Sequence, residues 1–250
     1  MEKKFKIGSS SIALGDVLCL TPLCFAGKAE VNLIPFHSPR LASLFDGIAD
    51  IKFSEEVSPC YNTNDKTHLA QRILNYYHVS EVNCIPKILI FEKEKEVAAD
   101  ILSKYKNPII FNNYSLPIRD SEKWIRHRRL PTALENSILS LLVEQGYDIL
   151  RFRWKPDIAD SQINLITGLN LRIQAACYFL INKYIGVDSG DYYLMLAAGG
   201  NATILINEDN PSICYRHHDW LFTEDLWKTE KMRVKYVRFQ DFEKCQINLV

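Results

Sequence analysis

The sequence predicts an α/β protein built from two Rossmann-like halves, residues 1–105 and 106–250. β-rich runs alternate with amphipathic helical patterns along the chain, which is typical of parallel sheets covered by helices. In residues 164–206, a strand candidate runs into an Asp-Ser-Gly turn and then into a helix. Ligands bind at such strand ends in open α/β sheets. No internal repeat or low-complexity linker interrupts the pattern.

The first half begins with a short strand and a helix separated by serines. Along it we expect strands at residues 5–8, 31–35, 48–53 and 87–91 and helices at residues 17–26, 40–45, 68–77 and 93–105. In the last of these helices, Val97, Ile101 and Leu102 recur at helical spacing and form one apolar side.

The second half repeats the alternation. We expect strands at residues 108–111, 147–153 and 184–187 and a further β-rich run ending at residue 206. Thr132 and Glu135 are spaced as a capping box for a helix that ends near Gly146. Asn170 is placed to cap the helix that precedes the strand at residues 184–187.

Composition excludes several functional classes. The chain has 250 residues, 47% of them hydrophobic, and its 30 basic and 30 acidic residues cancel, so the charge favours neither nucleic acid nor an anionic membrane. Its seven cysteines show no CxxC pair, which favours a reducing, cytoplasmic location. Lysines precede an apolar run at residues 12–27 as in a secretory signal, but Asp16 and Pro22 interrupt it. At most a peripheral membrane association is expected.

The Asp188-Ser189-Gly190 turn has two interpretations. Backbone N–H groups at the start of the following helix favour an anion such as a phosphate. Asp, Ser and Gly are equally the residues that begin an ordinary capped helix. Both interpretations remain open at this point.

Three motifs, in order, resemble the family 9 glycosyltransferases, which are the ADP-heptose:lipopolysaccharide heptosyltransferases and their relatives. Gly15-Asp16-Val17-Leu18 with Thr21-Pro22-Leu23 resembles the N-terminal GDVL...TP motif of that family. TGLNLRIQAA...YIGVDSG resembles its donor-site region, and Lys123-Trp124 stands where its KxW-type motif is expected. The resemblance covers residues 5 to 206.

The resemblance implies the GT-B arrangement, in which two Rossmann-like domains face a cleft, here with a shortened N-terminal domain. In many such proteins the last segment, here from about Arg233, returns to the N-terminal domain. It also implies an inverting transfer without metal or cofactor. Asp16 matches the proposed general base, which takes the proton of the acceptor hydroxyl. The alternative is that Asp16 is only a helix-start acid stabilised by the helix dipole.

The resemblance assigns the donor site as well. Ser189 and Gly190 would supply the diphosphate turn, Lys123 a point charge, and Asp188 a contact to donor hydroxyls. Tyr193 replaces a histidine that the family often has, and a phenol carries no charge near neutrality. Trp154 would either stack on the nucleotide base or pack in the protein. The basic side chains that surround Lys123 would either contact phosphate or form a solvated face: Arg126, Arg128 and Arg129.

Other site signals are weak. His217-His218-Asp219 is better explained as a surface loop than as a metal site, because adjacent histidines point apart and no third ligand is evident. The chain has no GxGxxG after a strand, no P-loop and no GxSxG elbow.

The expected function is therefore the transfer of heptose or a similar sugar from a nucleotide-diphosphate donor to a glycan, glycolipid or lipopolysaccharide-like acceptor. An ADP-sugar is the favoured donor. The alternative is an inactive nucleotide-sugar-binding protein derived from the same family.

Overall fold

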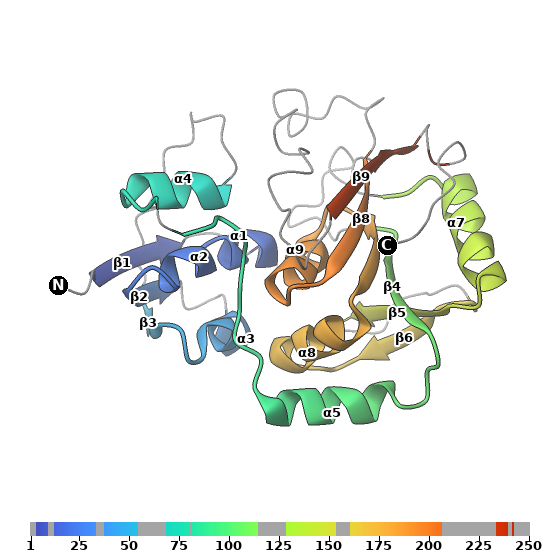
Figure 1. Cartoon of the computed structure of the whole chain (residues 1–250), viewed down its shortest axis with the longest axis horizontal. Coiled ribbons are helices and arrows are strands. Elements are labelled where there is room, and N and C mark those ends of the chain that lie inside the picture. The colour runs from blue at the N-terminus through green and yellow to red at the C-terminus, as the bar shows by residue number, and fades with distance from the viewer. Residues whose placement is uncertain are drawn as a thin grey trace.

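The computed structural model describes residues 4–9, 13–33, 38–54, 69–80, 82–114, 129–153, 161–206, 234–239 and 242. Lys123, Trp154 and the 217–219 cluster lie outside these residues. Two parallel sheets lie side by side, the first at the left and the second at the right of Figure 1. The two-half α/β architecture expected from the alternation of elements is confirmed.

The first sheet has three parallel strands in the order β1-β2-β3: β1 (Lys4–Ser9), β2 (Lys28–Leu33) and β3 (Asp50–Phe53). The helical elements of this half are α1 (Leu14–Leu18), α2 (Thr21–Cys24), α3 (Ser38–Ala42), the 3₁₀ helix η2 (Ser43–Phe45) and α4 (Leu69–Tyr76). The expected single helix over residues 17–26 is two short helices, because Pro22 has no N–H to continue a helix and instead stands in the first turn of α2.

The second sheet has six parallel strands in the order β6-β5-β4-β7-β8-β9. Its strands are β4 (Pro108–Asn112), β5 (Asp148–Arg153), β6 (Asn164–Thr167), β7 (Lys183–Val187), β8 (Asn201–Ile206) and β9 (Val234–Arg238). Its helices are α5 (Glu92–Leu102), α7 (Thr132–Glu144), α8 (Leu171–Ile181) and α9 (Gly190–Ala197). Counted within this sheet, the strand order is the doubly wound 3-2-1-4-5-6, whose topological switch point lies between β4 and β7.

One apolar core joins the halves. It includes Val17 of α1, Leu44 of η2, Tyr178 of α8 and Leu194 of α9, whereas a second core, with Phe111 and Ile138, lies on the other face of the second sheet. The two halves share a buried interface.

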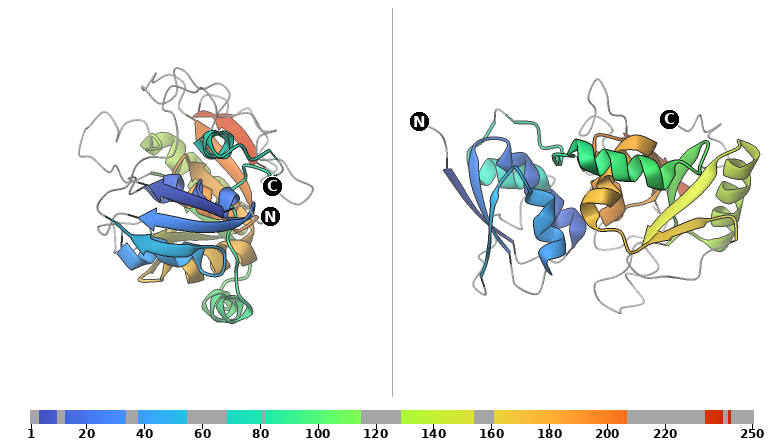
Figure 2. Two further views of the ribbon diagram at one scale, coloured as in Figure 1. Left: turned by 90° about the vertical axis from the view of Figure 1, so that its left-hand side faces the viewer. Right: turned by 90° about the horizontal axis from the view of Figure 1, so that it is seen from below.

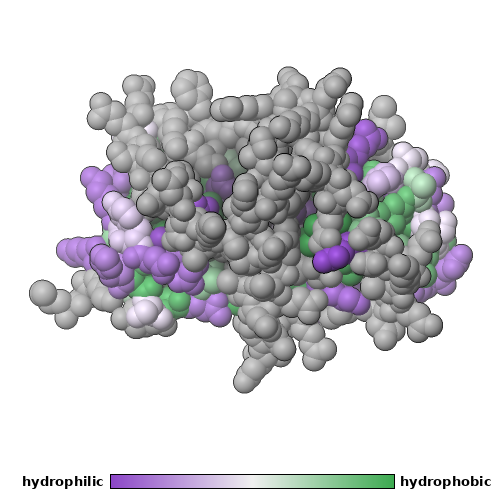
Figure 3. Space-filling view, turned by 90° about the horizontal axis from the view of Figure 1, so that it is seen from above, coloured by the Kyte–Doolittle hydropathy of each residue, from purple (hydrophilic) through white to green (hydrophobic). Residues whose placement is uncertain are grey.

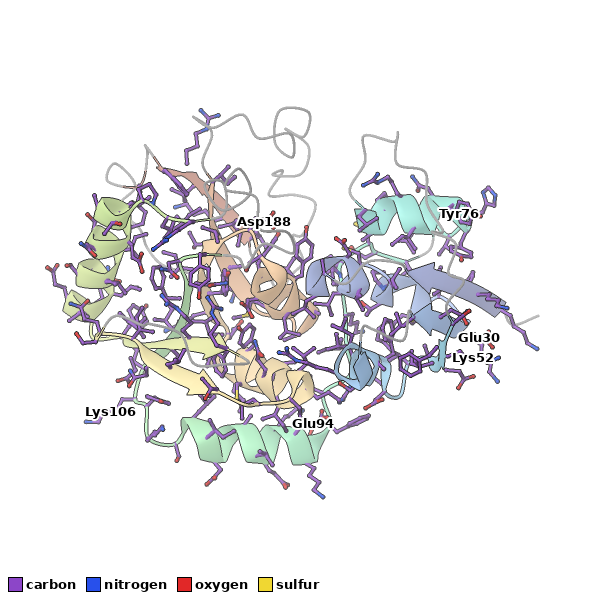
Figure 4. All side chains as sticks on the ribbon, turned by 180° about the vertical axis from the view of Figure 1, so that it is seen from behind. Glu30, Lys52, Tyr76, Glu94, Lys106 and Asp188 are labelled. Atoms are coloured by element: carbon purple, nitrogen blue, oxygen red, sulfur yellow. The ribbon has the colours of Figure 1, made fainter. Side chains whose placement is uncertain are left out.

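Arg172 of α8 forms polar contacts with residues on both sides of this interface. Its guanidinium donates to the carbonyl oxygen of Ser43 at 3.0 Å and to that of Leu89 at 2.6 Å. It also forms a two-pronged ion pair with Glu94, which Figure 4 places where α5 meets α8. The side chain is only 7% exposed, so these bonds join the first half, the linker and the second half in a nearly dry environment.

Two further expected details are wrong. Residues 87–91 form no strand; they belong to an irregular linker that, in Figure 1, passes from α4 to α5 across the junction of the halves. Thr132 is the first residue of α7 rather than its cap, and the carboxylate of Glu135 instead accepts a 2.5 Å hydrogen bond from Asn113. Residues 234–238 pair with residues 202–206 of β8, and the return of the last residues to the first half stays a prediction.

The division at residues 105 and 106 stays a prediction. α5 precedes that point in the sequence but packs against α8 of the second half. Figure 2 shows the same grouping from below, with α5 beside the second half.

Within the described ranges, no helix is long and apolar enough to cross a membrane. Those ranges also contain no cluster of three or more His, Cys, Asp or Glu side chains placed to hold a metal ion. Figure 3 shows described residues on both sides of this face, with hydrophilic and hydrophobic residues exposed on each side.

Candidate functional site

Four of the predicted site residues follow the carboxyl end of β7, and a fifth lies on the helix that contacts them. Asp188 directly follows the strand, Ser189 caps α9, and Gly190 and Tyr193 lie in the first turns of that helix. Asp16 lies in the first turn of α1, which packs directly against α9. Figure 4 places Asp188 above α9, on the side of the molecule opposite α5. The structure therefore brings Asp16 and the Asp-Ser-Gly turn to one interface.

Two glycines allow this close packing. A methyl group at Gly190 would lie 2.9 Å from Cβ of Leu14, and one at Gly15 would lie 2.8 Å from Cδ2 of Tyr193. Both distances are too short for real side chains, so each helix needs a glycine facing the other. Gly190 is thus required for the contact of α9 with α1, whatever its role towards a phosphate.

The carboxylates of Asp16 and Asp188 both act on the buried thiol of Cys19. Burial raises the pKa of Cys19 well above its ordinary value, and the charges of Asp16 and Asp188 raise it further. Both carboxylates therefore lie within electrostatic range of the same sulfur atom.

The hydroxyl of Ser189 is occupied by protein groups. It accepts hydrogen bonds from the backbone N–H of Tyr192 at 3.4 Å and from Nδ2 of Asn112 at 3.1 Å, and it is also bonded to the hydroxyl of Tyr184 at 3.1 Å. Ser189 is 4% exposed. Its side chain fixes the start of α9, so a ligand at this turn would be bound by backbone N–H groups.

A buried polar network lies behind the turn, at the switch point of the second sheet. Its hub is Asp191, whose two oxygens accept hydrogen bonds from Asn112 (3.0 Å), Arg153 (3.3 Å), Gln174 (3.0 Å) and Tyr178 (3.1 Å). Asn112 and Arg153 end β4 and β5, and Nη2 of Arg153 donates to Oδ1 of Asn112 at 2.6 Å. The network connects the carboxyl ends of two central strands, β4 and β5, to α8 and α9.

Asp191 sets the electrostatics of this network. Burial opposes the charge on Arg153, but Asp191 and Tyr114 outweigh it and raise the pKa of the guanidinium. Burial and then the charge of Asp191 raise the pKa of Tyr178 and of Tyr184, so both phenols stay neutral. Arg40 of α3 is half-buried; burial lowers its pKa, and attraction to Asp191 partly restores it. A cation of the first half therefore lies within range of the network.

Sequence reasoning missed this network, although signals for it exist. Asn112 and Arg153 stand at strand ends, where the Asp-Ser-Gly turn itself was found. Gln174 and Tyr178 are four residues apart on one helix face, and the 3.1 Å hydrogen bond between them uses that spacing.

The arrangement combines a carboxylate, a helix N-terminus and nearby cations. α9 directs its first N–H groups and its positive dipole end towards the side of Asp188, which suits an anionic ligand. Asp16 stands on the opposing helix, where a carboxylate can accept a proton. Of the predicted basic residues, Arg129 is described and pairs with Tyr114 in an isolated bridge, whereas Arg126 and Arg128 lie outside the described residues.

No protein-family model and no curated protein sequence matches the chain. Solved structures do match its fold. A glycosyl transferase family 9 protein from Veillonella parvula DSM 2008 superposes with a TM-score of 0.69 at 14% identity, over 98% of this chain and 89% of that one. The ADP-heptose lps heptosyltransferase II of E. coli gives 0.52 at 12% identity, over 94% and 92%.

The iron-containing dodecameric glycosyltransferase TibC of enterotoxigenic E. coli H10407 gives a TM-score of 0.56 at 11% identity, over 82% of this chain and 58% of that one. At these identities the likeness concerns the fold. The chain has the two-domain fold with parallel sheets that these structures share.

Proposed function

We propose that this protein is a glycosyltransferase that uses a nucleotide-activated sugar. The observation that carries the proposal is the meeting of Asp16 with the Asp188-Ser189-Gly190 turn across the interface of the two sheets. The fold likeness supports it, because the neighbouring structures are glycosyltransferases and TibC has been solved in complex with ADP-D-beta-D-heptose. The favoured donor is therefore an ADP-sugar, with heptose or a similar sugar.

The proposed reaction is an inverting transfer. The acceptor hydroxyl attacks the anomeric carbon of the donor while the bond from that carbon to the diphosphate oxygen breaks. The carboxylate of Asp16 takes the hydroxyl proton, and the nucleoside diphosphate leaves with the electron pair of the broken bond. Attack from the face opposite the leaving group inverts the anomeric configuration.

The departing diphosphate must be stabilised without a metal in this proposal. The N–H groups of Gly190 and the following residues of α9 provide fixed dipoles, and Lys123 and Arg40 provide positive charge. Asp188 would bind donor hydroxyls rather than phosphate, because like charges repel. Tyr193 would donate one neutral hydrogen bond where the family often has a histidine, and Trp154 would stack on the nucleotide base.

The acceptor is proposed to be a glycan or a lipopolysaccharide-like glycolipid, met in the cytoplasm and at most at the membrane surface. No nucleic-acid partner is proposed, since the formal net charge is zero.

Calorimetric titration of the full chain with ADP, UDP and GDP tests the donor class. We expect ADP to bind at least about tenfold more tightly than the other two, a difference of about 1.4 kcal/mol. Lys123→Ala should weaken ADP binding, more strongly at low salt, whereas Lys104→Ala, in the exposed turn after α5, should not. Absence of binding by all three nucleotides and by their sugars would overturn the proposal.

A further inference from the structure

A cavity lies at the opposite end of α9 from the Asp-Ser-Gly turn. Its volume is about 550 Å³, within the range of small-molecule sites. The walls come from the end of α2, the linker, α8 and the turn after α9, and they include Phe25, Val82, Ile88, Phe179, Leu196 and Ala197. The eight residues of α9 separate this cavity from the turn by about 12 Å of helix.

Hydrogen bonds hold the linker that forms one wall. The N–H of Ile88 donates to the carbonyl oxygen of Ala197 at 3.1 Å, which fixes the linker to the second half. The N–H of Lys87 donates to Oγ1 of Thr21 at 2.8 Å, which fixes it to the first half. Thr21 is fully buried and donates in turn to the carbonyl oxygen of Leu18, so its orientation is set. The cavity is therefore preformed.

Two cations, Lys87 and Lys95, and one amide, Asn83, border a lining that is otherwise apolar. Nζ of Lys87 lies 4.8 Å from the ring centroid of Phe25, and Nζ of Lys95 lies 5.2 Å from that of Phe179. Glu92 neutralises Lys95 at 2.6 Å. No acidic residue occurs among the described residues that line the cavity. The lining thus offers apolar contact to a ligand body and, at Lys87, a positive charge to one end of it.

We propose that this cavity binds an amphiphilic anion with a single alkyl chain, of the class of alkyl carboxylates and alkyl phosphates. The chain would lie between Phe25, Val82 and Phe179, where burial of apolar surface stabilises it. The anionic head would lie at Lys87. The site is separate from the proposed donor turn and does not depend on the transfer activity.

Titration calorimetry of the full chain with decanoate, decyl phosphate and decyltrimethylammonium tests the charge preference. The three probes have alkyl chains of nearly equal length, so the charge of the head is the main difference between them. We expect both anions to bind at one site and the cation to bind at least about threefold to tenfold more weakly. Equal affinity for all three, or no binding of either anion, would overturn the proposal.

Variants test the location. Lys87→Glu should weaken decanoate binding about threefold to tenfold, whereas Lys104→Glu, which reverses the charge of an exposed lysine outside the cavity, should leave it unchanged. Val82→Trp should narrow the cavity and weaken binding of both anions. Lys87 is exposed, so its variant remains informative even if Val82→Trp does not fold. Unchanged decanoate affinity in Lys87→Glu would contradict the assigned site.

Discussion

The ring of Tyr193 packs so closely against Gly15 that a methyl group on Gly15 would lie 2.8 Å from its Cδ2 atom. This contact joins the helix after the first strand of one half to the helix after the Asp-Ser-Gly turn of the other. Asp16 directly follows Gly15 in the sequence. The contact of the Tyr193 ring with Gly15 therefore sets the distance between the proposed base, Asp16, and the proposed donor turn.

Gly15→Ala should therefore separate α1 from α9. Overpacking of this kind costs about 1–3 kcal/mol, and we expect urea unfolding to show a loss of that size. The double variant Gly15→Ala/Tyr193→Ala removes the obstructing ring, so its loss should be smaller than the sum of the single losses. Additive losses, within about 0.5 kcal/mol, would show that the two residues do not interact.

Asp191→Asn should be strongly destabilising. Arg153, 9% exposed, would lose its charged partner and keep a buried charge, a change that costs about 3–5 kcal/mol. Urea unfolding measures the loss. Glu30→Gln breaks the exposed pair with Lys52 on the first sheet and serves as the matched control, with a much smaller effect. If both variants are equally stable, Asp191 is not the hub of the network.

Four cysteines should resist alkylation in the folded protein. Cys19, Cys24, Cys84 and Cys177 are buried free thiols, and burial raises the pKa of Cys24 and of Cys177 to about 12. At pH 8 only about one such thiol in ten thousand is a reactive thiolate. Iodoacetamide labelling followed by peptide mass spectrometry should find these four modified only after unfolding. Rapid labelling of Cys24 or Cys177 in the native protein would contradict their burial.

The same thiols predict the alkaline limit of stability. Their pKa is higher in the folded protein than the ordinary value of 9.0, so the folded state holds protons that the unfolded state releases. The contribution of the two protonated thiols to the free energy of unfolding is complete below pH 9 and is lost as the pH rises towards 12. The free energy of unfolding, measured by urea at pH 8, 9, 10 and 11, should fall above pH 9, and less steeply in a Cys24→Ala/Cys177→Ala variant. A constant value over this range would contradict the prediction.

Local sequence patterns were sufficient to predict strands and helix caps where the patterned residues are buried. The strands around Ile110 and Ile185 are short apolar runs, and those around Ile7 and Val31 alternate apolar with polar residues. The cap at Asn170 is confirmed, because its Oδ1 accepts a 2.9 Å hydrogen bond from the N–H of Ile173. These features depend on neighbouring residues alone, so the sequence suffices to find them.

Features that depend on distant partners could not be found in the same way. The run at residues 87–91 has strand composition, yet it binds Ala197 and Thr21 instead of a sheet. Glu135 has capping-box spacing, yet a tertiary partner, Asn113, donates to its carboxylate. The Asp191 network combines strand ends from positions 112 and 153 with two helices, and only the fold brings them together.

The central claim is that Asp16 is the general base of a sugar transfer, and the most direct measurement compares Asp16→Asn with the parent protein. The readout is acceptor-dependent release of nucleoside diphosphate from a nucleotide-sugar donor, with donor affinity measured by calorimetry on the same samples. Asp100→Asn, an exposed substitution on α5, is the matched control. We predict a loss of about a hundredfold to ten-thousandfold in the rate for Asp16→Asn, with nearly unchanged donor affinity. Transfer by Asp16→Asn at the parental rate would contradict the claim and leave Asp16 as a helix-start acid.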